Sequence, residues 1–498
     1  MPTAKPTVTP TVTPAVTPTA ISAAVPPEGP TVTPLDLADI QGNVLRGYSA
    51  RLARHFALGV TDRACAGRLL AALLPGAPGD GPKVSTAEIW STKPPYCLTV
   101  GLTWAGLGSL GVPPAVQQLF PASFMQGPAT PATKATQLGD DGPSEPGLWE
   151  LGGPKTPTVH LLLSLYTHSH VPTLLESMSA TLRSMFATGG VVEISSHDAA
   201  ALPDGEVHFG YKDGIAQPRI KGVPGKQLPD MQPEVDPGDF VLGGGHINQY
   251  GGNFLGDLPS ALGNNATYGA FRLLEQDAEA FENLINKVGV RYRMDAEMVA
   301  AKLMGRWRNG VPLVLSPDTP EPKGGIPHGT INEFDYAPTP EHPTYFDDQK
   351  GARCPVGSHI RRLNPRGSLV MGIQYLRRII RRAMPYGPAY HPAKPDGLKR
   401  GLVGYFMCGD LAMQFEFMQG IWANEDIATA GLLGSRDPIL GAQPPEKGKF
   451  VIRTNDSRDP IEFGVVPRLV TTRGSVYCLL PGIGGLRFLA ALAPRATP

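Results

Sequence analysis

The sequence predicts an α+β protein built from two units. Residues 96–102 and 159–166 are apolar segments of strand length. Residues 171–188, which follow the second of these segments, carry apolar side chains at helical spacing. A second run of strand-like and helix-like segments follows from about residue 361. At 498 residues the chain is also too long for one ordinary core.

The first unit reads as strand, helix, strand, helix, strand. Residues 96–102 predict a strand, and residues 106–110 lead into a helix-like pattern that ends near residue 120. Residues 159–166 are apolar on both faces, which is typical of a buried strand. A helix over 171–188 and a short strand over 191–195 complete a unit that we place at residues 35–202.

The second unit is predicted to cover residues 203–498, with a loop-rich insertion at about 220–350. The segment 203–327 holds glycine clusters and two helix patterns, at 271–288 and around 295–307. After residue 361 the order is an apolar run at 402–408 and a helix pattern at 411–424. Two strand-like stretches within 466–481 and a helix at 484–492 follow.

The first 34 residues form a segment of low complexity. They include nine proline and nine threonine residues, so they lack the apolar surface that would offset the entropy of ordering. We predict a disordered tail. Lys5 is the only early basic residue and no continuous apolar stretch follows it, unlike a standard secretory signal. The expected location is therefore the cytoplasm, with export left open.

Composition argues against several classes of partner. Lysine plus arginine and aspartate plus glutamate both total 44, so no charge excess favours nucleic acid or an anionic membrane. No apolar run approaches the roughly 18 residues of a membrane span. The five cysteines form no CxxC pair, which is typical of reduced thiols rather than of a disulfide framework or a zinc site.

His359 is the first candidate for chemistry, within Cys354-Pro-Val-Gly-Ser-His-Ile-Arg-Arg-Leu-Asn-Pro-Arg366. A neutral imidazole is a good ligand for haem iron, and the arginines after it suit the two carboxylates of a haem. By itself the pattern is weak, because a single histidine among eleven is more often a core or surface residue than a ligand.

Two further motifs surround it. Gly210-Tyr-Lys-Asp-Gly214, followed by Gln217, places Asp213 on a tight turn, although Asp-Gly is also a common surface turn. Residues 377–382 hold four arginines around two isoleucines. They could form a basic patch for nucleic acid, or a strand that directs one or two arginines inward. The neutral total charge disfavours the first alternative.

The order and spacing of these motifs resemble the dye-decolourising peroxidase family. Further blocks extend the resemblance from about residue 36 to 494, namely Asp36-Leu-Ala-Asp-Ile-Gln-Gly-Asn, Leu274-Glu-Gln-Asp277, Gly305-Arg-Trp307, the segment 406–417 and the segment 473–481. The resemblance implies two ferredoxin-like domains with antiparallel sheets, of the dimeric α+β barrel type, and a b-type haem, one per chain, mostly against the second.

The resemblance also implies residue roles. His359 matches the proximal iron ligand, Asp213 the distal acid and Arg381 the distal arginine. Arg366 and Arg362 are expected near the haem propionates, Gln217 beside the haem, and Asp410 as the carboxylate that hydrogen-bonds the proximal imidazole. The expected substrates are hydrogen peroxide and an organic electron donor that is phenolic, dye-like or of another kind.

Two alternatives remain from the residues alone. A haem-binding or haem-handling protein would need the ligand without Asp213 and Arg381. A non-haem interaction protein would use its arginines to bind acidic partners. The oligomeric state does not follow from the sequence.

Overall fold

The computed structural model describes residues 34–169, 172–225, 229–250, 258–368, 374–427, 432–452, 461–464 and 466–492. The predicted tail, residues 1–34, lies outside this part of the chain except for Pro34. Among the described residues no helix is both long and apolar enough to cross a membrane.

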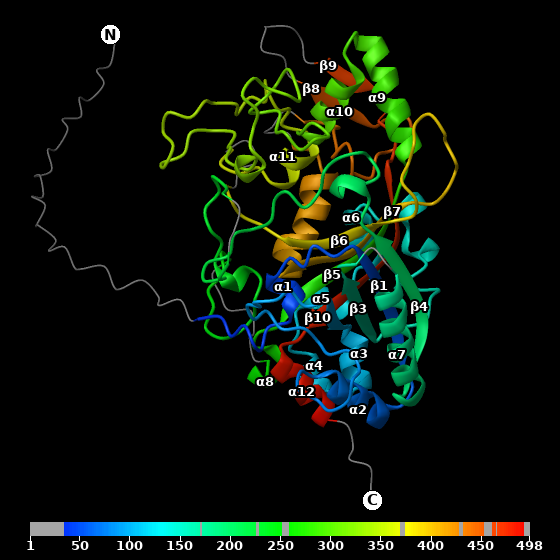
Figure 1. The fold of residues 1–498 in the computed structure, drawn as a ribbon. Coiled ribbons are helices and arrows are strands. Elements are labelled where there is room, and N and C mark those ends of the chain that lie inside the picture. The colour runs from blue at the N-terminus through cyan, green and yellow to red at the C-terminus, as the bar shows by residue number, and fades with distance from the viewer. Residues whose placement is uncertain are drawn as a thin grey trace, which may run out of the picture.

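An eight-stranded sheet organises the molecule (Figure 1). Its strand order is β4-β1-β3-β2-β10-β5-β7-β6, so strands from the two halves of the chain occupy separate halves of the sheet. The N-terminal half holds β1 (Leu52–Val60), β2 (Tyr96–Leu102), β3 (Leu161–Thr167) and β4 (Val191–Ala200). The C-terminal half holds β5 (Thr267–Gln276), β6 (Ile380–Tyr386), β7 (Gly401–Cys408) and β10 (Val470–Leu480).

All neighbouring strands of this sheet are antiparallel, which confirms the predicted α+β class. Within each half the pairing is extensive, whereas β2 and β10 share the single register pair Leu102 and Leu479. The outer strands β4 and β6 approach each other to within 8 Å between Cα atoms without entering one ladder. The sheet therefore curls but does not close into a barrel.

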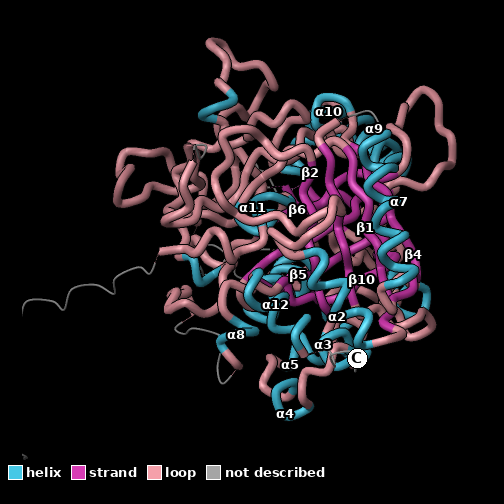
Figure 2. Tube along the Cα trace, turned by 60° about the horizontal axis from the view of Figure 1, so that its bottom comes forward, coloured by secondary structure: helices cyan, strands magenta, loops and turns pink. Residues whose placement is uncertain are grey.

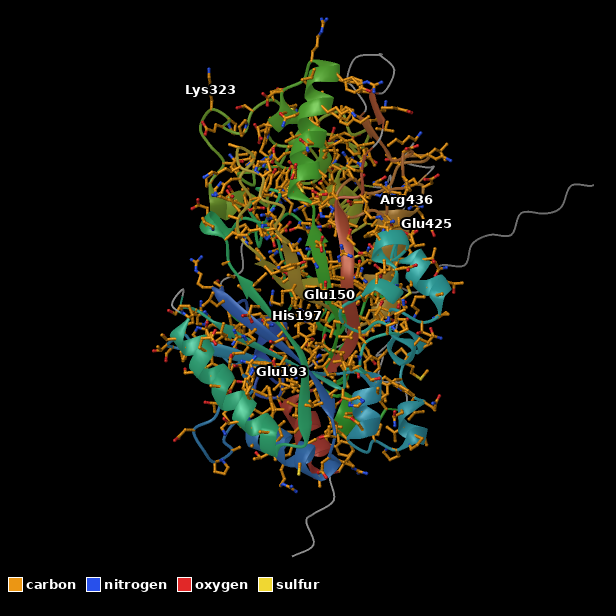
Figure 3. The ribbon with its side chains drawn as sticks, turned by 90° about the vertical axis from the view of Figure 1, so that its right-hand side faces the viewer. Glu150, Glu193, His197, Lys323, Glu425 and Arg436 are labelled. Atoms are coloured by element: carbon orange, nitrogen blue, oxygen red, sulfur yellow. The ribbon has the colours of Figure 1, made fainter. Side chains whose placement is uncertain are left out.

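Helix α7 (Thr173–Thr188) packs on β1, β3 and β4, and loops gather on one side of the molecule (Figure 2). An ion pair adds to this packing, because Glu193 lies on β4 (Figure 3) and its Oε2 atom is 2.8 Å from Arg183 Nε on α7. The longer helices are α2 (Arg63–Leu73), α7 (Thr173–Thr188), α9 (Ala278–Tyr292), α10 (Ala296–Met304) and α12 (Ile483–Ala491). The shorter helices are α1 (Gly42–Leu45), α3 (Trp104–Ser109), α4 (Pro114–Gln117), α5 (Ala122–Gln126), α6 (Ala132–Gln137), α8 (Ser260–Gly263) and α11 (His359–Leu363).

Several predicted elements agree with the structure and others do not. The strand at 96–102 and the helix ending at residue 188 are confirmed, whereas β1 and α2 were not predicted. The helix predicted over 271–288 is wrong in its first part, because β5 runs to Gln276 before α9 begins. The pattern at 411–424 consists mainly of two π-helical segments, η7 (Leu411–Glu416) and η8 (Met418–Trp422). A separate two-stranded sheet joins β8 (Lys449–Ile452) and β9 (Ile461–Gly464).

A buried ion pair links the two halves of the chain. Asp140, just after α6, accepts two hydrogen bonds of 2.7 Å from Arg272 on β5. Thr472 on β10 joins them through its hydroxyl group, which donates to Asp140 and accepts from Arg272. Because both charged side chains are almost fully buried, the pair fixes the N-terminal segment against the C-terminal strands.

Asp239 gives a prediction for the pH dependence of stability. Its side chain is fully buried, Oδ1 accepts a hydrogen bond from Gln249 N, and Oδ2 has no partner among the described residues. Burial raises the pKa of Asp239 from 3.8 to about 7. Between these values the folded state holds a proton that the unfolded state has released, so this group makes stability fall as pH rises.

We therefore expect Asp239→Asn to reduce the loss of stability between pH 4 and pH 7, since asparagine carries no charge to bury. The free energy of unfolding, measured by urea titration across this range, tests the expectation. Each unit of pKa difference corresponds to about 1.4 kcal/mol. Asp204→Asn at an exposed position is the control. An identical pH slope in Asp239→Asn and the parent protein would contradict the assignment.

Candidate active site

A cavity of about 350 Å³ lies against the C-terminal half of the sheet. This volume is within the range of about 300–1,000 Å³ typical of cofactor and ligand sites. Every residue that lines it falls between Val207 and Val470, in the predicted second unit. Apolar side chains form much of its wall, among them Leu363, Ile379, Leu402, Phe406, Phe415, Met418, Ile439 and Leu440.

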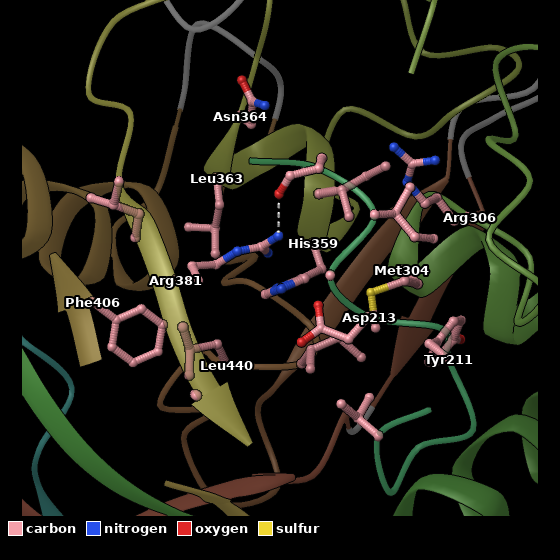
Figure 4. Close-up of a pocket in the computed structure, with 18 of the residues that line it drawn as sticks. Tyr211, Asp213, Met304, Arg306, His359, Leu363, Asn364, Arg381, Phe406 and Leu440 are labelled. Carbon is pink, nitrogen blue, oxygen red and sulfur yellow. Dashed lines mark hydrogen bonds between the residues drawn. The ribbon is translucent and has the colours of Figure 1, made fainter. Parts of the chain in front are cut away.

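His359 begins helix α11 and projects into this cavity (Figure 4). Its Nδ1 atom lies 3.0 and 3.1 Å from the two carboxylate oxygens of Asp437. A carboxylate only accepts, so Nδ1 carries the proton and the lone pair of Nε2 remains free for a metal ion. Burial opposes ionisation of Asp437, but the contact with His359, the backbone N–H of Leu440 and the charge of Arg362 together lower its pKa.

Asp437 corrects the prediction for Asp410. Asp410 does not contact His359; its carboxylate accepts a hydrogen bond from Met413 N and caps the start of η7. Sequence reasoning missed Asp437 because it lies 78 positions after its partner. The only local signal is an Asp-Pro dipeptide after Gly434, which predicts a turn and not a ligand partner.

Asp213 lies at the end of a short hairpin. Glu206 and Lys212 form a bridge, and Asp213 N donates to Gly205 O at 3.0 Å. Gly210, with φ of 81°, allows the tight turn and packs against Arg308. Tyr211 anchors the hairpin through its hydroxyl group, which donates to the carbonyl oxygen of Ala300 on α10. The carboxylate of Asp213 thereby enters the cavity near His359 (Figure 4).

Arg381 enters the same cavity from β6. Its Nη2 atom donates to Ala216 O at 2.7 Å, beside the Asp213 hairpin (Figure 4). Gln217 lines the cavity too, and its amide forms two hydrogen bonds with the backbone of Arg381. Gln217 thus holds the strand against the hairpin. Arg382 points to the opposite face, where its guanidinium donates to Asn43 O, as alternation along a strand requires.

Arg366 also lines the cavity, and its role beside the propionates stays a prediction. It donates to Asp230 at 2.9 Å and to Phe334 O at 2.6 Å, and its guanidinium stacks on the Phe334 ring.

Arg306 and Arg378 lie in the same wall but donate to carbonyl or amide oxygens. Burial lowers the pKa of both to about 10. Among the described residues that line the cavity, Asp213 carries the only carboxylate, so the cavity has an excess of positive charge.

Arg362 was predicted to contact the cofactor, and the structure contradicts this. Its side chain is completely buried and does not line the cavity. It donates to the backbone oxygens of Trp422, Glu425 and Ser435, and so holds the segment that leads to Asp437. The adjacent Arg361 is likewise occupied, by Asp348 and nearby carbonyl oxygens. Helix α11 therefore directs both arginines into the protein, away from the cavity.

These features suit a haem. Within the described ranges no three histidine, cysteine, aspartate or glutamate side chains cluster as ligands for a free metal ion. A metal at His359 would therefore take its remaining ligands from a prosthetic group. Apolar walls match a porphyrin, and buried arginines without carboxylate partners match its two propionates. Arg306 and Arg378 thus join Arg366 as arginines of the cavity wall that are suited to bind propionates.

Known proteins resemble this chain over most of its length. A dye-decolorizing peroxidase of Mycena epipterygia is 29% identical over 92% of this chain and 87% of its own length. A multifunctional dye peroxidase, DyP2, of Amycolatopsis sp. is 30% identical over 79% of this chain and 82% of its own. No family model matches the chain.

Solved structures show the same fold. A crystal structure of DyP superposes with a TM-score of 0.76 at 24% identity, covering 92% of this chain and 99% of the other. A dye-decolorizing peroxidase in complex with 2,6-dimethoxyphenol gives a TM-score of 0.74 at 24% identity, covering 92% of this chain and all of the other.

Fold, cavity and sequence similarity together define a peroxidase, an oxidoreductase that reduces hydrogen peroxide while oxidising an organic electron donor. The chain belongs to the dye-decolorizing peroxidase family. Members of this family depend on haem, which agrees with the chemistry of the cavity.

Proposed function

We propose that this peroxidase binds one haem b per chain, that His359 Nε2 would hold its iron, and that the protein oxidises phenolic or dye-like donors. The observation that carries the proposal is the His359–Asp437 pair, which leaves Nε2 free inside a cavity that also holds Asp213 and Arg381. A haem held there would supply the redox chemistry that the reduction of peroxide requires. The similar protein crystallised with 2,6-dimethoxyphenol supports phenols as the donor class.

The roles of the chain's own residues follow from their positions. Arg378 and Arg306 would hold the propionates and balance their charge, and Arg366, which already pairs with Asp230, would donate a further hydrogen bond. Asp213 would take a proton from one oxygen of peroxide and deliver it to the other oxygen, so that water can leave. Arg381 would hold the peroxide and stabilise negative charge as the O–O bond breaks. Gln217 is a positioning residue, because it fixes the backbone of Arg381 beside the Asp213 hairpin.

Absorbance and turnover test this proposal directly. Protein produced with haem available should show a Soret band, bind one haem per chain and oxidise 2,6-dimethoxyphenol only when peroxide is present. A Soret band without turnover would favour the haem-handling alternative instead. Protein that takes up no haem would contradict both functions.

Asp437 gives a second expected result. Asp437→Asn keeps an acceptor for His359 Nδ1–H but removes the negative charge behind the ligand, so the imidazole becomes a weaker electron donor. We expect haem affinity or peroxidase turnover to fall about 10–100-fold. Haem titration and steady-state assays measure the two effects.

Asp410→Asn is the matched control, because asparagine can still cap η7. It should leave haem binding and turnover close to those of the parent protein. A severe Asp410→Asn variant beside a mild Asp437→Asn variant would restore the role predicted for Asp410 from the sequence.

A further inference from the structure

Met304 lies where the cavity meets the hairpin that carries Asp213. It is the last residue of α10, it lines the cavity, and its thioether points inward beside Asp213 and His359 (Figure 4). One helical turn earlier, the carbonyl oxygen of Ala300 accepts the hydrogen bond from Tyr211. Helix α10 and the hairpin are thus joined directly, and Met304 is held on the hairpin side of the cavity.

Met418 lines the same cavity but belongs to a different part of its wall. It packs with Val356, Trp422 and Leu432, next to the segment that leads into His359. Met304 instead packs against the core cluster that contains Phe209 and Tyr211 of the hairpin. The two methionines therefore belong to different side-chain clusters, and Met304 is the one that packs against the hairpin of Asp213.

We propose that Met304 is the site at which this peroxidase oxidises itself. The inference rests on the proposed function, because it requires peroxide to be activated beside Asp213. In the net step the sulfur gives up two electrons and bonds one oxygen atom of peroxide. The O–O bond breaks, and the other oxygen leaves as water with both protons. The product is methionine sulfoxide, which places a polar group in a cavity with apolar walls.

An organic donor competes with this step, since it supplies the electrons that Met304 would otherwise lose. Self-oxidation of Met304 is therefore greatest when peroxide is turned over without a donor. The lifetime of the active protein should therefore depend on the ratio of peroxide to donor.

The experiment follows oxygen into individual methionines. The haem-loaded protein is treated with ¹⁸O-labelled hydrogen peroxide, and peptides are analysed by mass spectrometry at successive times. Met304 should gain one labelled oxygen before Met418 and before Met413, which is 37% exposed and reports oxidation by free peroxide. Adding 2,6-dimethoxyphenol should suppress labelling of Met304 and leave Met413 unchanged. Met304→Leu, a swap that conserves volume, should abolish this label and slow the loss of peroxide-consuming activity.

Peroxide consumption is recorded in the same samples. Consumption with Met413 or Met418 labelled first, or with Met304 labelling unaffected by the donor, would overturn the inference and leave the proposed function standing. A protein that consumes no peroxide would contradict both together.

Discussion

Replacement of His359 by alanine should remove haem from the protein. Within the described part of the chain, His359 is the one cavity-lining residue with a free side-chain nitrogen suited to iron, and Asp437 already orients it. We expect folded His359→Ala protein with little or no Soret band and no peroxide-dependent oxidation of 2,6-dimethoxyphenol. Haem content per chain and circular dichroism separate loss of the ligand from loss of the fold.

His391→Ala, at an exposed position outside the cavity, is the control and should retain haem and activity. Externally added imidazole provides a further check, because it can occupy the space left by the missing side chain. Full haem content with an unchanged spectrum in His359→Ala would show that another residue holds the iron.

Replacement of Arg381 by leucine should slow the reaction with peroxide without removing haem. The guanidinium lies in the cavity beside the Asp213 hairpin, so its loss removes a donor aimed at developing negative charge. The second-order rate constant with peroxide, measured by stopped-flow absorbance per bound haem, should fall by about 10²-fold or more. Arg381→Lys keeps the charge and should recover part of the rate.

Arg382→Leu distinguishes this electrostatic role from a general effect of removing an arginine. Arg382 faces away from the cavity and donates to Asn43 O, so its loss should reduce stability by about 1–3 kcal/mol. Its rate constant per bound haem should stay near that of the parent protein. If Arg382→Leu were the slow variant and Arg381→Leu the normal one, Arg382 and not Arg381 would be the arginine of β6 that faces the cavity.

Much of the site could be predicted because its motifs are local. Asp213, Gln217, His359, Arg366 and Arg381 each lie in a short recognisable segment, and the structure brings all five to one cavity. Their catalytic and cofactor roles stay predictions for the variants above. Asp437 could not be predicted, since it meets His359 only through tertiary folding and its neighbours form an ordinary turn.

The errors in secondary structure have a similar cause. Strand β5 is buried on both faces, so its side chains show no alternation of polar and apolar types. It also joins α9 after the single residue Asp277, and the apolar positions of the two elements merge into one apparently helical spacing. Arg362 was misplaced because sequence spacing does not show which side of a five-residue helix faces a ligand.

The single register pair between β2 and β10 has a consequence for how the protein opens. Few backbone hydrogen bonds join β2 to β10, so slow local unfolding should begin at this junction. Deuterium uptake by amides is expected to divide the molecule into two cooperative blocks, one on either side. The Asp140–Arg272 ion pair joins the segment after α6, from the N-terminal half of the chain, to β5 in the C-terminal half of the sheet. Removing the Asp140–Arg272 ion pair should therefore make deuterium uptake in the two blocks less synchronous.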